Sequence, residues 1–125
     1  MRLFLTQIIF VFLAGIVLGA EAPAPAQYRT MEKLTLDQKV GLGMKIVREN
    51  PKLGKAILLG LVKDYKDDFE KNKNLLSDTY SCLGDAEIIE AKDTEKAILW
   101  HEKALSVNPA NVPSLIFKGR YFFSK

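Results

Sequence analysis

Apolar residues recur every three or four positions through most of the chain after residue 34, the spacing that places them on one face of an α-helix. The first such stretch opens with Thr35 and Gln38, which are three apart as in a capping box, and ends at Asn50. Pro51, a residue favoured in a first helical turn, starts the second stretch. No stretch alternates apolar and polar residues as a strand would. The pattern therefore predicts an all-α protein.

Three more helices are expected further along the chain. One runs from about residue 75 to 90, after a polar interval at residues 63–74. The next begins at a cap formed by Asp93 or Thr94 and stops at Asn108-Pro109, and the last starts near Pro113 and runs to the end. The expected domain thus has about five helices.

The first twenty residues have a different pattern from the rest. A single cation, Arg2, precedes a long apolar run that ends in the small pair Gly19-Ala20, as in a signal peptide cleaved after Ala20. An uncleaved anchor is the alternative, because residues 3–20 are about long enough to span a bilayer. In both cases Arg2 stays on the cytoplasmic side and the rest is exported, to a periplasmic or secreted location. Residues 21–33 are then a Pro/Ala-rich linker and residues 34–125 the helical domain.

Charge and cysteine content narrow the function classes. The net charge of +3 comes from 18 basic and 15 acidic residues whose signs alternate, so no basic patch indicates a nucleic-acid partner. An exported chain whose only cysteine is Cys82 has no internal disulfide framework. We expect Cys82 to be a small buried residue, with an intermolecular disulfide as the alternative.

Part of the sequence occurs twice. The run Lys55-Ala56-Ile57-Leu58 returns 41 positions later as residues 96–99, and the same offset relates Leu42-Gly43 to Leu83-Gly84. A duplicated helix pair explains this repetition, and periods of this order are typical of stacked-helix solenoids. Small residues at a helix crossing let two helices approach closely.

Residues 75–125 resemble the tetratricopeptide repeat family, and the Lys-Ala-x-x-Trp run ending at Trp100 resembles its Sel-type relatives. Residues that match the pattern are Tyr80, Leu83, Gly84, Ala97, Ala104, Pro109, Leu115, Gly119 and Phe122. Glu87, His101 and Lys118 depart from it, since they replace two aromatic residues and a leucine. The resemblance implies a short solenoid of antiparallel helix pairs. Its packing residues would be Leu83, Gly84, Ala97, Ala104, Pro109 and Gly119.

The family resemblance also implies a function. Such repeats form a curved array whose concave face binds peptides or other proteins. Carried onto this chain, the concave face would present Asp78, Ser81, Asp85, Ile116, Arg120 and Phe123; the alternative for its polar members is a solvated helix surface. We therefore expect an exported scaffold for protein–protein interaction. The alternative is a membrane-tethered structural subunit, held by residues 3–20.

Catalysis finds little support in the sequence. His101 is the only histidine and stands where the family has a packing aromatic, so we expect it in the core. We expect the neighbouring Trp100 to pack in the core or between repeats. No phosphate-binding loop or nucleophile motif occurs. We expect no catalytic residue, no metal site and no cofactor, and not an enzyme.

The last helix, within SLIFKGRYFFSK, is apolar on more than one face. Terminal repeats normally present a polar outer face, because nothing stacks on them. The chain is therefore either a piece of a longer array, or this helix docks on a partner or on a second copy of the chain.

Overall fold

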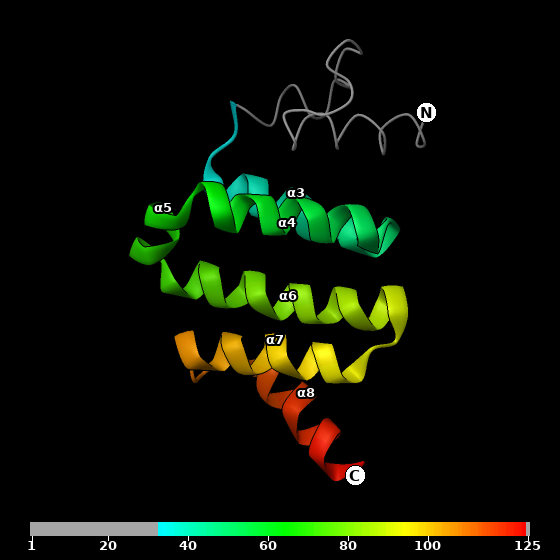
Figure 1. Cartoon of the computed structure of the whole chain (residues 1–125). Coiled ribbons are helices and arrows are strands. Elements are labelled where there is room, and N and C mark those ends of the chain that lie inside the picture. Colours follow the sequence, from blue (N-terminus) through cyan, green and yellow to red (C-terminus); the bar gives the residue numbers. More distant parts are fainter. Residues whose placement is uncertain (1–32, 125) are drawn as a thin grey trace.

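The computed structural model describes residues 33–124, so the predicted signal peptide or anchor and nearly all of the predicted linker lie outside the described residues (Figure 1). The described residues form helices without strands, which confirms the all-α class. The helices are α3 (Leu36–Glu49), α4 (Pro51–Asp64), α5 (Lys66–Lys71), α6 (Lys73–Ala91), α7 (Thr94–Val107) and α8 (Val112–Phe123). None of these six combines the length and the hydrophobicity that a membrane-crossing helix needs.

Side-chain caps fix the helix starts much as the sequence predicts. Thr35 Oγ1 accepts a hydrogen bond from Gln38 N at 3.2 Å, and Gln38 Oε1 accepts one from Thr35 N at 2.9 Å, which completes the capping box. Asn50 ends α3 and caps α4 by accepting from Leu53 N. Asp93 caps α7 by accepting from Lys96 N at 3.0 Å. The predicted starts of these three helices are therefore confirmed.

Two details differ from the sequence prediction. The polar interval at residues 63–74 contains the short helix α5, whose Phe69 is only 1% exposed and belongs to the core. A single apolar residue has no periodicity, so the pattern gave no sign of this helix. The last helix starts at Val112, one residue before Pro113, because Asn111 provides the cap, with its Oδ1 atom 3.0 Å from Ser114 N.

The helices stack in pairs around α6. Figure 1 shows α3 and α4 as one antiparallel pair lying over a second pair, α6 and α7, with α8 following α7. Helix α6 packs against α3, α4, α5 and α7, whereas α8 packs mainly against α7. The centre of the core lies between the two pairs, with Ile57, Leu58 and Leu83 fully buried.

The two copies of the repeated run are not packed alike. In the second copy Ala97 is fully buried, whereas its counterpart Ala56 is partly exposed. In the first copy Leu58 is fully buried, whereas its counterpart Leu99 is 65% exposed. Helix α4 packs against α3, α5 and α6, whereas the main contacts of α7 are with α6 and α8. All-α architecture is thus established, while a regular repeat arrangement stays a prediction.

The predicted packing residues divide into two groups. Leu83, Gly84, Ala97 and Ala104 are buried, and a Cβ atom on Gly84 would lie 2.7 Å from His101 Nε2 and 3.0 Å from the Ala97 carbonyl oxygen. Pro109 and Gly119 are exposed. A Cβ atom on Gly119 would meet nothing within 4 Å, because no described helix covers that side of α8. Pro109 is exposed because it lies in the turn after α7. Both residues are thus exposed among the described residues, and their packing role stays a prediction.

The closest approach between α3 and α4 occurs at Gly54. A Cβ atom there would lie 2.5 Å from Val47 N and 2.6 Å from Val47 Cα, so an added methyl group would push against backbone. At Gly43, the glycine of the repeated Leu-Gly pair, an added Cβ atom would instead meet the flexible side chain of Leu58.

We expect Gly54→Ala to lower the free energy of unfolding by about 1–3 kcal/mol, because the two helices must move apart. Gly41→Ala is the matched control: Gly41 lies exposed in α3 with nothing within 4 Å of a Cβ atom. Alanine there should raise the free energy of unfolding by up to about 1 kcal/mol through its helix propensity. Urea denaturation followed by circular dichroism measures both, and equal effects would contradict the close approach.

Candidate partner-binding groove

A groove of about 410 Å³ lies between α3 and α6 and reaches the first turn of α8. It is lined by Met44, Val47, Arg48, Asp78, Ser81, Cys82, Asp85, Ile89 and Pro113. The walls are mostly apolar, with charged groups placed along them. Such a mixture suits a segment of another protein, whose apolar side chains would be buried and whose polar groups would set the orientation.

The structure brings together three of the six residues predicted for partner binding. Asp78, Ser81 and Asp85 lie on one face of α6, at the spacing of successive helical turns, and all three line the groove. The other three, Ile116, Arg120 and Phe123, are exposed on α8 and do not line it. Helix α8 meets the groove only at Pro113, so the rest of this helix points elsewhere.

The opposite wall was not predicted as a binding surface. Met44 and Val47 of α3 follow the apolar spacing of that helix, which indicates only a packed face. Which part of such a face stays open depends on how the first helix pair sits on the second. That arrangement is a tertiary property, for which the sequence carries no local signal.

The floor beneath Ser81 is a buried polar network. Ser81 is 5% exposed, and its Oγ atom lies 3.4 Å from Nδ1 of His101, which also contacts Ser114 Oγ at 2.8 Å. The His101 ring is fully buried and stacks on Phe117, with 4.3 Å between ring centroids. The expected core position of His101 is therefore confirmed.

Asp85 lies beside the same histidine. Its Oδ1 atom is 3.3 Å from His101 Nε2, although Nε2 makes no hydrogen bond. Serine, histidine and aspartate together have the composition of a catalytic triad, but the Ser114 hydroxyl is completely buried. A substrate could not reach the Ser114 hydroxyl, and the contacts of His101 with Ser114 and Asp85 connect α6, α7 and α8.

Asp78 is held by the residue that caps α8. Asn111 Nδ2 donates to Ser77 Oγ at 2.8 Å and to Asp78 Oδ1 at 3.3 Å, and Ser77 Oγ donates to the Ala104 carbonyl oxygen at 2.7 Å. Burial raises the pKa of Asp78 above its usual value, because removal from water disfavours the charged form. One asparagine thus attaches α8 to the groove wall.

Cys82 differs from its prediction. It is half-buried and lines the groove, whereas we expected a buried residue. Burial raises the pKa of its thiol to about 11, and the negative charge of Asp85 adds to this. Its place on the helix face shared with Asp85 explains the difference, because that face opens into the groove.

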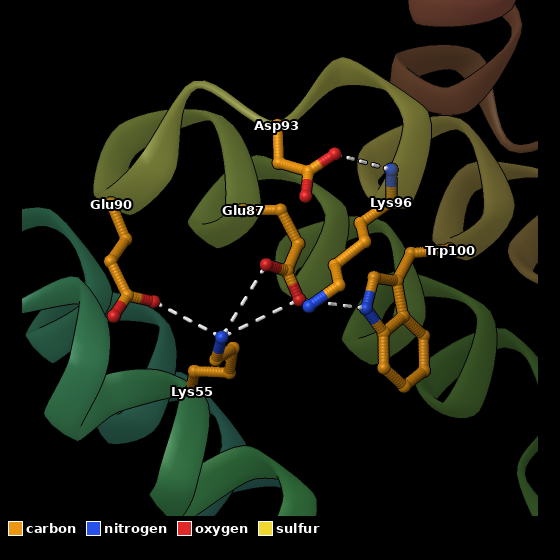
Figure 2. Close-up of polar contacts among 6 residues, drawn as sticks. All are labelled: Lys55, Glu87, Glu90, Asp93, Lys96 and Trp100. Carbon is orange, nitrogen blue, oxygen red and sulfur yellow. Dashed lines mark hydrogen bonds and ion pairs between the residues drawn. The ribbon is translucent and has the colours of Figure 1, made fainter.

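The face of α6 turned away from the groove carries an ionic cluster (Figure 2). Lys55 Nζ lies 3.4 Å from Glu87 Oε1 and 3.0 Å from Glu90 Oε1. Trp100 Nε1 donates to Glu87 Oε2 at 3.2 Å. Desolvation lowers the pKa of Lys55, but the two glutamates outweigh it and the net shift is upward. The cluster joins α4, α6 and α7, and the half-buried Trp100 packs against the core as expected.

Comparisons of the chain with protein-family models, curated proteins and solved structures found no match. The resemblance to tetratricopeptide repeats therefore rests on the residues quoted above. Between residues 33 and 124, no three His, Cys, Asp or Glu side chains are placed to hold a metal ion together. The groove is the candidate site that the described residues offer.

We expect Cys82 to react with iodoacetamide at pH 8.5 roughly 100 times more slowly in the folded chain than in urea, because its pKa rises from 9.0 to about 11. The folded-state pKa is the higher one, so the thiol favours folding below pH 9 and this contribution is lost as the pH rises to about 11. A Cys82→Ser, Ser106→Cys variant, with its cysteine on the exposed end of α7, should react almost as fast folded as unfolded. Equal protection in both proteins would contradict the assignment.

Proposed function

We propose that the protein is an exported scaffold that binds a segment of another protein in the groove between α3 and α6. The observation that carries this proposal is the groove itself, whose two walls come from different helix pairs and combine apolar with charged side chains. The tetratricopeptide resemblance agrees with it, because the same face of α6 is the one implied to bind. The extracytoplasmic location rests on residues 1–20, which lie outside the described residues.

Binding would be driven by burial of the apolar wall. Met44 and Ile89 expose apolar surface to the groove, and each square ångström of such surface removed from water contributes about 25 cal/mol. Val47 is part of the core and is only 2% exposed, so the wall is already in place before a partner arrives. A preformed surface reduces the entropy lost on binding.

The proposal can be tested by cross-linking followed by affinity measurement. A photo-reactive amino acid at position 44, in the full chain in its native host, should capture a partner that the same amino acid at position 99 does not. Leu99 is 65% exposed on α7 and outside the groove. With the purified partner, Met44→Glu combined with Ile89→Glu should weaken binding at least about ten-fold, a loss of about 1.4 kcal/mol.

Leu99→Glu is the matched control, since it also places a carboxylate on an exposed apolar position. Circular dichroism establishes that each variant is folded. Capture from position 99 as efficient as from position 44, or a partner indifferent to the groove variant, would contradict the proposal.

A second candidate function is that of a membrane-tethered subunit of an assembly. The observation that favours it is an apolar stripe along α8, at the spacing of one helix face. The exposed members of this stripe are Val112 (60% exposed), Leu115 (48%), Ile116 (49%), Phe122 (55%) and Phe123 (94%). A stripe of this kind is typical of a surface that contacts another protein or a second copy of the chain.

For this second candidate, we expect the purified chain to self-associate in sedimentation velocity and to bind a hydrophobic dye. Phe122→Ser combined with Phe123→Ser should shift the chain to monomer and reduce dye binding, because both rings are exposed and their loss leaves the core intact. Leu99→Ser is the control for loss of an exposed apolar residue elsewhere. A monomeric wild-type chain without dye binding would exclude self-association through α8.

A further inference from the structure

We infer that the partner segment in the groove is a helix that presents two basic side chains seven residues apart, with apolar residues between them on the same face. This inference rests on the proposed function and specifies the chemistry of its ligand.

The two groove aspartates lack a cationic partner among the described residues. Within residues 33–124, neither Asp78 nor Asp85 forms an ion pair with a lysine or arginine, and Arg48 on the opposite wall pairs with neither. On the other face of the same helix, Glu87 and Glu90 both pair with Lys55. The two aspartates outnumber the one arginine of the groove, so its lining carries a net negative charge.

Both carboxylates can take a further partner. Asp85 has a side chain that is 55% exposed, and Asp78 is also exposed. Each has one described polar side-chain neighbour, Asn111 for Asp78 and His101 for Asp85, whereas a carboxylate can accept several hydrogen bonds. Desolvation raises the pKa of Asp78, so its ionised form has too little compensating charge nearby. An incoming ammonium or guanidinium group would provide that charge.

Asp78 and Asp85 are seven residues apart on α6. Residues seven apart on a helix lie on one face, about 10.5 Å apart along the axis. A helical ligand with basic residues at its own positions i and i+7 matches this distance and keeps both on one face. An extended ligand would cover the distance in about three residues, and residues three apart on a strand point to opposite sides. A helix therefore matches the two carboxylates better than a strand does.

The part of the groove between the two aspartates has an apolar wall opposite it. Between Asp78 and Asp85, Ser81 and Cys82 line the groove on α6. Met44 and Val47 lie on the opposite wall. Apolar residues at positions i+3 and i+4 of the ligand helix would point into this part of the groove, since they share a face with i and i+7. The ligand is thus an amphipathic helix with basic residues flanking an apolar pair.

The test uses three labelled synthetic peptides of about 18 residues, long enough to form a helix. The first has lysine at i and i+7 with leucine at i+3 and i+4, in an alanine-rich host. The second replaces both lysines by glutamate, and the third moves the second lysine from i+7 to i+5, off the shared face. Fluorescence anisotropy with the full chain, at low salt and at about 0.15 M salt, gives the affinities.

We expect the first peptide to bind most tightly and to slow the alkylation of Cys82, which places it in the groove. Asp78→Asn and Asp85→Asn should each weaken its binding about five-fold, as loss of an exposed ion pair does. Asp67→Asn combined with Asp68→Asn is the matched control, because it removes two negative charges from the exposed surface of α5 and should leave binding unchanged.

Tighter binding of the glutamate peptide, equal binding of the third peptide, or indifference to the groove aspartates would overturn this inference and leave the proposed function standing. If no peptide binds but a partner is cross-linked from position 44, this inference is likewise overturned and the proposed function stands. If no peptide binds and no partner is captured from position 44, both the inference and the proposed function are wrong.

Discussion

The whole structure depends on α6 being covered on several sides. It contacts α3, α4, α5 and α7, so polar residues on its buried faces must find partners inside the protein. Ser77 donates to the Ala104 carbonyl oxygen, Thr79 to the Leu75 carbonyl oxygen, and Glu87 accepts from Trp100. Each of these bonds avoids the free-energy cost of an unsatisfied buried group, and the two that involve Ala104 and Trp100 also attach α7 to α6.

The same helix separates two kinds of electrostatic environment. On one side, Glu87 and Glu90 share Lys55, and the resulting cluster holds the first helix pair to the second. On the groove side, Asp78 and Asp85 lack such a cation among the described residues. Charges that stabilise the fold are therefore neutralised locally, whereas the charges beside the groove remain available to a ligand. This contrast, and not the groove volume alone, gives the candidate site a chemical preference.

Local rules predicted the helices well, and tertiary contacts explain what they missed. Thr35, Pro51 and Asp93 marked helix starts correctly, because capping depends on residues only a few positions apart. Phe69 was missed as a core residue because its helix is short and otherwise polar. Three groove residues on α6 followed from one helix face, but the wall on α3 did not. The sequence marked Glu87 only as a departure from a family pattern. Its structural role was missed because its partner Lys55 is 32 positions away in the sequence.

Asn111 gives α8 a particular kind of folding behaviour. Its Oδ1 atom caps the helix by accepting from Ser114 N, while its Nδ2 atom binds Ser77 and Asp78 on α6. A helix of 12 residues is too short to be stable alone in water. Because one side chain both starts the helix and attaches it, helix formation and docking become a single cooperative event. Helix α8 should therefore lose its amide protection together with its contacts to α6, without populating an undocked helical state.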